Sequence, residues 1–544
     1  MSATANETSQ ANDKLLFWAS FVAIMTTAFG FIIRALILDE LKTDFDWTET
    51  QKGEIFGVGL YPFSISIILF SLVIDRIGYK TAMYFAFVCH TLSAIVTIFA
   101  PQMFNPYWSI YLGTFIVALG NGTVEAVANP VVATLFPKEK TKWLNILHAG
   151  WPGGLVLGGI ITIMLDTNGL IAKIFNAGQA LPWQVKVTLL LLPTFAYGFM
   201  MLFCKFPVSE RVAAGVSDRD MMKEFGIGGA LIAGFLIYSE LGRVAIAFAG
   251  EDFEMTISII KWIALAVTVI GFGAYVGFAI GRPLFLFMLL IMIPLATTEL
   301  GTDSWITSLM EPQMKAEGFH PGWVLIYTST IMMILRFFAG SIVHRISPLG
   351  LLAASSVIAI IGLLFLSRSD GLFMIFAAAT IYGFGKSFFW PTMLGVVAEQ
   401  SPKGGALTLN ACGGVGMLGV GVVGAVFLGY IQDTTTDQQI AKEMPAIHKQ
   451  VTTEKKWTFG KYEALDQEKV NELPKAEQEE VEKVVNQSKK SALATVAIFP
   501  GIMLVCYIIL ILYFMSKGGY QAEVLTGHGA EDDKFTGGVE GPVE

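Results

Sequence analysis

Apolar residues follow one another along this chain in runs of about twenty, and polar residues collect in the short stretches between them. An α-helix needs a run of about 20 apolar residues to cross the hydrocarbon core of a bilayer. We read fourteen such runs, at 15–38, 54–74, 80–100, 107–131, 143–165, 184–204, 225–247, 257–280, 284–308, 322–342, 349–367, 371–396, 405–430 and 493–515. The pattern predicts an all-α polytopic membrane protein with about 14 transmembrane helices.

Composition narrows the class of protein further. Hydrophobic residues make up 54% of the 544 residues and charged residues only 15%, against about 25% charged in soluble proteins. The net charge of −8 argues against a nucleic-acid partner. The four cysteines form no metal-binding spacing, and no nucleophile–base arrangement emerges, so we expect neither an enzyme nor a bound cofactor. The expected partners are the lipid bilayer and a small-molecule substrate, and we expect a monomer.

Lysine and arginine in the short loops predict the orientation, because they favour the cytoplasmic side. Their distribution places both termini in the cytoplasm, with residues 1–14 and the acidic, Gly-rich residues 516–544 as tails, and a bacterial inner (plasma) membrane is our expectation. The charged segment 432–492 is then an extracytoplasmic loop. Charge patterning favours a solvated spacer there, and its second part can form one polar helix broken at Pro474.

The chain contains an internal repeat. Pro137–Lys138 followed by Leu144–Asn145 recurs as Pro402–Lys403 followed by Leu409–Asn410, at an offset of 265 residues. The repeat predicts two six-helix halves, residues 15–206 and 284–515, with residues 207–283 as a linker that contains two extra central helices. One class of transporters is built from such parallel repeats, with the substrate site at the middle of the membrane between the halves.

Several motifs carry a family resemblance. Asp75 to Lys80 (DRIGYK) resembles the loop motif of the major facilitator superfamily, with Ser71 in place of its leading glycine. Within that superfamily, residues 125–130 (EAVANP), Leu144–Asn145 and residues 299–305 (ELGTDSW) are similar to the fucose/proton symporter family. That family has an acidic residue in its first span, where this chain has Arg34. The resemblance implies a transporter fold and a proton-coupling role for Glu125.

Charged residues inside apolar runs are costly and point to function. Five stand out in this chain, namely Arg34, Glu125, Glu299, Asp303 and Lys386. Because the repeat offset relates positions of opposite charge in equivalent spans, we expect Arg34 to pair with Glu299 or Asp303, and Glu125 to pair with Lys386, in at least one state. Glu125 and Lys386 are the candidate proton-coupling residues, since burial and a nearby lysine act oppositely on a carboxyl group. Buried ion pairs that serve only packing are the alternative.

Aromatic faces and amides near these charges suit a sugar. The candidate substrate-binding residues are Arg34, Asn129, Asn145, His148, Trp151, Glu299, Asp303, Trp305, Trp390 and Asn410. Tryptophans are also common at membrane interfaces, His148 can serve helix packing, and Asn129 can cap the helix that Pro130 breaks. As candidate gating residues we name Asp75, Arg76, Lys80, Arg336 and Arg345, which lie toward the cytoplasmic ends of their spans.

The sequence therefore predicts a secondary active transporter that works by alternating access, with proton-coupled uptake of a monosaccharide or similar polyol as the first hypothesis. The first alternative is an organic-anion or sugar-acid transporter that uses Arg34 as a clamp, since arginine geometry suits a carboxylate. A further alternative is an exporter or facilitator without proton coupling. The alternative from another class is a membrane sensor or assembly subunit with 432–492 as its interaction surface.

Overall fold

The computed structural model describes residues 2–103, 105–302, 322–369, 371–457 and 460–525, with the single positions 314, 318 and 320. Within these residues, 13 helices are long and apolar enough to cross a membrane, or 14 if the pair formed by residues 323–346, bent by 58°, counts as one span. The protein is a multi-pass, all-α membrane protein, as its hydrophobic pattern predicts. The span expected at 322–342 is the bent pair.

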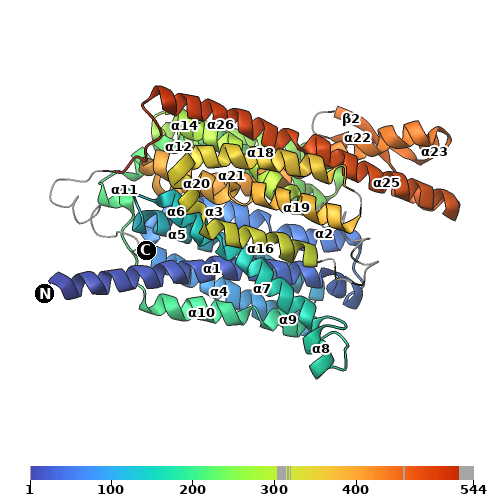
Figure 1. Ribbon diagram of the computed structural model, residues 1–544, viewed down its shortest axis with the longest axis horizontal. Helices are drawn as coiled ribbons and strands as arrows, with labels where there is room; N and C mark the ends of the chain where they lie inside the picture. The colour runs from blue at the N-terminus through green and yellow to red at the C-terminus, as the bar shows by residue number, and fades with distance from the viewer. Residues whose placement is uncertain are drawn as a thin grey trace.

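The first half consists of long helices joined by short turns (Figure 1). Its elements are α1 (Ser2–Asp44), α2 (Glu49–Val58), α3 (Tyr61–Ile77), α4 (Tyr79–Ile98), η1 (Ala100–Gln102), α5 (Pro106–Leu135), α6 (Lys140–His148), α7 (Gly150–Leu165), α8 (Leu170–Phe175), α9 (Trp183–Thr188) and α10 (Leu191–Phe203). Glycines on α7 let it approach α1 closely: a methyl group at Gly154 would lie 2.2 Å from the Met25 carbonyl oxygen.

Residues between the halves form α11 (Glu210–Ala213), α12 (Asp218–Ala249), η2 (Glu251–Phe253) and α13 (Glu254–Val276). Helix α12 packs against α14 and α21 of the second half, and α13 packs against α12 on the outside of the bundle. Large apolar side chains of α13, such as Ile263 and Val267, are exposed, as expected for a helix that faces lipid.

The second half repeats the pattern of long helices with breaks. Its elements are α14 (Pro283–Ala296), the π-helical turn η3 (Thr297–Gly301), α16 (Trp323–Phe337), α17 (Ala339–Ile346), α18 (Pro348–Leu366), α19 (Leu372–Lys386), α20 (Phe389–Gln400), η4 (Pro402–Gly404), α21 (Gly405–Gly419), the π-helical turn η5 (Val420–Gly424), α22 (Ala425–Glu443), α25 (Lys475–Val496) and α26 (Ile498–Ser516). The halves meet where α7 packs on α16, α6 on α20, and α3 and α5 on α21.

The charged segment between α22 and α26 is a folded unit, so the expectation of a solvated spacer is wrong. It contains α23 (Pro445–Val451), an antiparallel hairpin of β1 (Thr452–Trp457) and β2 (Gly460–Leu465), and α24 (Gln467–Asn471) before α25. The predicted polar helix is broken at Pro474, as expected, because α25 begins directly after it. The apolar core of the whole folded unit consists of Ile440, Val451, Val470, Val481 and Val484. We call this unit, residues 433–488, the loop subdomain.

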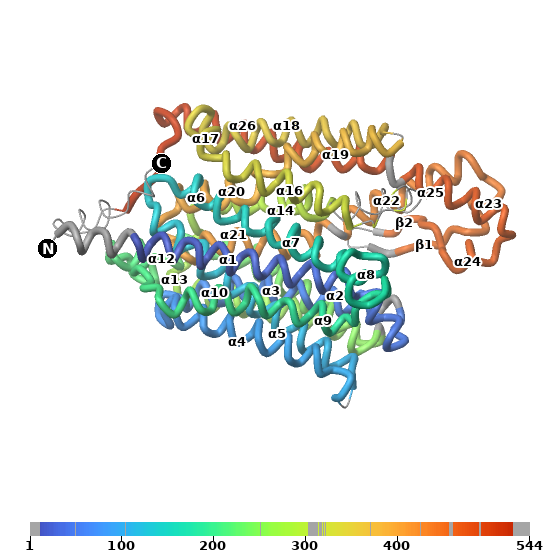
Figure 2. Tube along the Cα trace, turned by 60° about the horizontal axis from the view of Figure 1, so that its bottom comes forward, coloured from blue at the N-terminus to red at the C-terminus, as the bar shows by residue number. Residues whose placement is uncertain are grey.

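The bundle has two distinct ends (Figure 2). Helix α1 begins and α26 ends at one of them, which we call the terminal end, and the loop subdomain projects from the opposite end, which we call the loop end. One large apolar core runs through both halves, so the polar side chains inside it must satisfy one another.

Candidate functional site

A buried polar cluster lies in the first half where α5 meets α6. Glu125 and Asn129 stand one helical turn apart on α5, and the Asn129 amide donates to the Glu125 carboxylate at 2.8 Å. His148, the last residue of α6, places Nε2 2.9 Å from Asn129 Oδ1 and 3.9 Å from Glu125 Oε2. All three side chains are buried. Asn129 is therefore more than a cap for the helix at Pro130, because it connects a carboxyl group to an imidazole.

A second cluster lies in the other half, around a break between helices. Helix α19 ends at Lys386 and α20 begins at Phe389, so backbone groups between them lack helical partners. Arg336 Nε donates to the Ser387 carbonyl at 2.7 Å, and the Trp390 amide donates to Glu299 Oε2 at 2.9 Å. Arg336 Nη2 also pairs with Glu299 Oε1 at 2.7 Å. Glu299 lies on the π-helical turn η3, a distortion that is frequent at functional sites.

One hydrogen bond joins the two clusters across the interface between the halves. Arg336 Nη1 donates to the His148 carbonyl oxygen at 2.7 Å. That carbonyl lies at the break between α6 and α7. A continuous polar path therefore runs from Glu125 through Asn129, His148 and Arg336 to Glu299, inside an apolar core. We call it the central network.

The other predicted amides lie beside the central network and also join the halves. Asn145 donates to Thr392 Oγ1 of α20 at 3.1 Å and to the Thr141 carbonyl at 2.9 Å. Asn410 of α21 donates to the Ala126 carbonyl of α5 at 2.9 Å, while its own Oδ1 is buried without a partner in the described part of the chain. In this conformation these two amides hold helices together, and the Asn410 oxygen remains free to accept.

The predicted aromatic residues have different surroundings. Trp151 lies between Phe31 and Phe63, each with its ring centroid 6.2 Å away. Trp390 packs against α21, where a methyl group at Gly416 would lie 3.0 Å from the indole ring. Lys386 is buried, with Nζ 5.8 Å from the centre of the Tyr382 ring. Asp303 and Trp305 lie outside the described residues.

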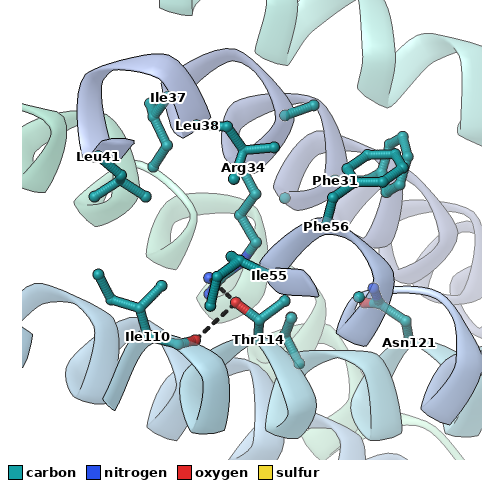
Figure 3. A pocket seen from close by; sticks show the side chains of 14 residues that line it. Phe31, Arg34, Ile37, Leu38, Leu41, Ile55, Phe56, Ile110, Thr114 and Asn121 are labelled. Carbon is teal, nitrogen blue, oxygen red and sulfur yellow. Dashed lines mark hydrogen bonds between the residues drawn. The ribbon is translucent and has the colours of Figure 1, made fainter. Parts of the chain in front are cut away.

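Arg34 does not pair with Glu299 in this structure, where that carboxylate pairs with Arg336. Its other expected partner, Asp303, lies outside the described residues. The Arg34 guanidinium instead contacts three hydroxyl groups, those of Ser93 at 2.7 Å, Thr97 at 3.2 Å and Thr114 at 3.4 Å. Arg34 lines a cavity of about 530 Å³, open solvent included, between α1, α2 and α5 (Figure 3). Most of the cavity wall is apolar, with Asn121 and Thr114 as its other polar side chains.

Glu125 likewise does not contact Lys386 in this conformation, since its partners among the described residues are Asn129 and His148. The pairing expected from the repeat offset is absent from this one state. Both charged groups nevertheless lie buried within the core, as their positions in the apolar runs indicate.

The loop-motif residues form an ion network at the terminal end. Asp75 accepts from the buried Arg211 at 2.5 and 3.0 Å, and Arg211 also pairs with Asp218 at 3.0 Å. Arg76 pairs with Asp218 at 2.7 Å. Lys80 Nζ lies 3.4 Å from the Leu202 and Cys204 carbonyls, and Arg345 is exposed at the end of α17. Arg336, named with these residues as a candidate for gating, lies in the central network and not in this ion network.

Sequence reasoning missed a second set of contacts that closes the terminal end. Glu399 of α20 accepts from the backbone and hydroxyl of Thr141 at 2.9 and 2.6 Å, across the interface between the halves. Lys140 pairs with Glu210 at 2.6 Å, and both are buried. Thr141 and Glu399 flank the repeated Pro-Lys motifs, so their position beside a repeated loop was the available signal.

Residues 520–525 lie over this closure. The Tyr520 hydroxyl donates to Glu399 Oε2 at 2.6 Å, and Glu523 forms a two-pronged pair with Arg282 at 2.6 and 3.0 Å. The Leu525 amide donates to Glu210 at 3.1 Å. Burial and the Glu399 carboxylate raise the pKa of Tyr520 well above its usual value, so the phenol remains a donor. This segment therefore binds Glu399 of the second half together with Arg282 and Glu210 of the linker between the halves.

A two-half helical bundle with a buried polar path between the halves is the architecture of a secondary transporter. The chain matches the model of the Major Facilitator Superfamily over residues 16–310, and it belongs to that superfamily. A curated relative, the class E tetracycline resistance protein of Escherichia coli, is 26% identical over 147 residues, which cover 26% of this chain and 35% of that protein. The match spans about a third of that relative's length.

Solved structures share the fold. The proton:xylose symporter XylE of E. coli superposes with a TM-score of 0.59 at 12% identity, covering 95% of this chain and 98% of that one. The transporter FucP in its outward conformation gives a TM-score of 0.53 at 15% identity, covering 90% and 98%. The human organic anion transporter TETRAN gives 0.55 at 12% identity, covering 90% and 99%.

Proposed function

We propose that this protein is a proton-coupled secondary transporter that imports a monosaccharide or similar polyol by alternating access. The observation that carries the proposal is the central network, which joins the two halves through the Arg336–His148 bond. Alternating access requires the halves to rock about a site between them, and rocking must break or remake this bond. The network therefore couples the polar groups of the site to the conformational change.

The two buried carboxyl groups of the network are held differently. Glu299 is balanced by Arg336 and by the Trp390 amide. Glu125 meets an amide and, at 3.9 Å, an imidazole. We assign Glu125 the role of proton carrier, because its partners stabilise it without a fixed full charge. Movement of His148 with α6 would change the surroundings of Glu125 during the cycle.

The terminal end is the cytoplasmic end in this proposal, since most lysines and arginines of the short loops lie there. The contacts of Glu399 with Thr141 then close the cytoplasmic side. Two structural neighbours are named as a proton:xylose symporter and a fucose:proton symporter, which supports the choice of a sugar.

Uptake in proteoliposomes tests the proposal. Wild type and Glu125→Gln would be offered hexoses and pentoses with and without an inward proton gradient. We expect wild type to accumulate a sugar when the gradient is present, and Glu125→Gln to lose accumulation while retaining counterflow exchange. Glu254→Gln is the matched control, because Glu254 is exposed at the start of the peripheral α13. Gradient-driven accumulation by Glu125→Gln equal to that of wild type would exclude Glu125 as the carrier.

A second candidate substrate class is an organic anion such as a sugar acid. Arg34 supports it, because the guanidinium lines a cavity and the partners the structure gives it among the described residues are hydroxyl groups. Arginine binds carboxylates through paired hydrogen bonds. In this case uptake of sugar acids should be lost in Arg34→Gln, with the response to the proton gradient intact, and sugars should not be accumulated by wild type.

A further inference from the structure

The loop subdomain has few means of holding itself together. Its apolar core consists of five aliphatic side chains, Ile440, Val451, Val470, Val481 and Val484, with a few half-buried neighbours. Cores this small commonly rely on disulfides or metal ions. All four cysteines of the chain lie elsewhere, at positions 89, 204, 412 and 506. A disulfide therefore cannot supply the missing stabilisation.

Three metal-ligating side chains converge in this unit from three different elements. They are Asp437 on α22, His448 on α23 and Glu463 on β2. One ligand atom of each lies within 4.8 Å of the others, and His448 Nε2 lies 2.7 Å from Asp437 Oδ1. Asp437 and His448 are half-buried, whereas Glu463 is exposed and leaves the cluster open to solvent.

The charges around the cluster favour a cation. The hairpin register places Glu463 directly opposite Glu454, and like charges at such a pair are destabilising. Lys461 bonds to Glu454 at 2.6 Å and Lys455 to Asp433 at 3.3 Å. No lysine or arginine in the part of the chain that the structure describes is paired with Glu463 or with Asp437. The cluster therefore contains two carboxylates and one imidazole, and the imidazole pairs with Asp437.

We propose that Asp437, His448 and Glu463 bind one divalent transition-metal ion, with Zn²⁺ as the best fit. One imidazole and two carboxylates are ligands that zinc accepts, and three protein ligands leave a fourth position for water. The ion neutralises the charges of Asp437 and Glu463 and ties α22, α23 and β2 to one another. Its site is separate from the central network, so it stabilises the loop subdomain without taking part in the transport path.

Metal binding to the full-length, tag-free protein in detergent tests this proposal. After removal of metal with a chelator, titration with ZnCl₂ should give one equivalent bound, and Co²⁺ should give a visible spectrum of a low-coordinate site. Glu463→Gln should weaken zinc binding by more than about tenfold, as loss of a ligand predicts, and His448→Ala should do the same. Glu454→Gln is the matched control, because Glu454 lies opposite Glu463 on the hairpin but outside the cluster.

Limited proteolysis supplies an independent measurement. Zinc should slow tryptic cleavage between residues 442 and 490 in wild type and in Glu454→Gln, but not in Glu463→Gln, because a ligand that binds only the folded state stabilises it. Glu463 is exposed, so its replacement leaves the fold intact, whereas His448→Ala also removes an ion pair. Equal zinc binding by wild type and Glu463→Gln would overturn the proposal. So would proteolysis that is independent of zinc in wild type, which would leave His448–Asp437 as a simple ion pair.

Discussion

Arg336 and Glu299 form an ion pair of 2.7 Å in which neither side chain is more than 4% exposed. Removing one partner of a buried pair leaves the other charge uncompensated and costs about 3–5 kcal/mol. We therefore expect Arg336→Met to lower the free energy of unfolding by that amount, measured by denaturant titration in detergent micelles. The double variant Arg336→Met/Glu299→Leu should recover part of the loss, because it leaves no isolated charge.

A transport assay distinguishes the contribution of this pair to stability from its contribution to transport. The double variant should remain inactive in proteoliposomes, since the bond from Arg336 to the His148 carbonyl is also lost. An Arg336→Met protein as stable as wild type would show that Glu299 is not held as a charged group.

Gly395 marks a close approach of the two halves at the terminal end. A methyl group there would lie 2.4 Å from Thr141 Oγ1 and 2.6 Å from Thr141 Cα. Because the backbone of α6 cannot give way as a side chain can, Gly395→Ala should oppose closure of this end. We expect faster thiol labelling of a cysteine placed at Asn145 in a cysteine-free background. Gly153→Ala is the control, since its methyl group would lie at an ordinary 3.4 Å from Met333 Sδ, and faster labelling in both variants would contradict this account.

Tyr520 should favour the closed terminal end. Its hydroxyl donates to Glu399, the same carboxylate that holds Thr141. A hydrogen bond to a charged group contributes about 1.5–3 kcal/mol, so Tyr520→Phe should shift the equilibrium toward the open state by roughly tenfold or more. The Asn145 labelling assay measures this shift. Tyr513→Phe, at a half-exposed position on α26, should leave labelling unchanged.

Arg211 is buried and depends on Asp75 for two of its hydrogen bonds. Asp75→Asn removes the negative charge but leaves Asp218 as a partner, so we expect a loss of about 1–3 kcal/mol. The thermal unfolding midpoint in detergent measures it. Asp220→Asn removes an exposed carboxylate and should have no such effect. Equal midpoints for wild type and Asp75→Asn would show that Asp218 alone neutralises Arg211.

Much of the architecture follows from the sequence, because crossing a bilayer imposes a strong pattern. Apolar runs of fixed length can be read directly, and the charges inside them predict burial. Glu125, Glu299 and Lys386 are all buried, as their positions indicate. The association of Glu125 with Asn129 was not among the predictions, although the two residues stand four apart and therefore share a helix face.

The partners of these charges could not be predicted in the same way. The repeat offset relates Arg34 to Glu299, but an offset fixes a position along a helix and not the direction of the side chain across the bundle. Arg336 reaches Glu299 because breaks after His148 and Lys386 expose carbonyl groups that a guanidinium can bind. The sequence does mark these carbonyls, because Pro152 and Pro391 stand four residues after His148 and Ser387 and supply no N–H. It does not indicate which distant side chain binds them.

The loop subdomain could not be predicted from the sequence for a different reason. Its five core residues come from four separate elements of a highly charged sequence, and only Val481 and Val484 share a helix, so local periodicity does not reveal the set. Charge density alone favours a spacer, whereas the packing of α22 on α25 and α23, and of α24 on α23 and α25, brings the aliphatic side chains together.

The helical stretches 402–443 and 475–516, each 42 residues long, would measure about 63 Å if straight, at 1.5 Å per residue. A bilayer's hydrocarbon core is only about 30 Å thick. Each stretch is therefore long enough to place one part in the lipid and the other part in water. The loop subdomain joins the two parts that extend beyond the lipid. A small tilt of the parts within the lipid would displace the far ends of these helices by a larger distance. A fluorescent label at those ends would report the tilt without contacting the central network.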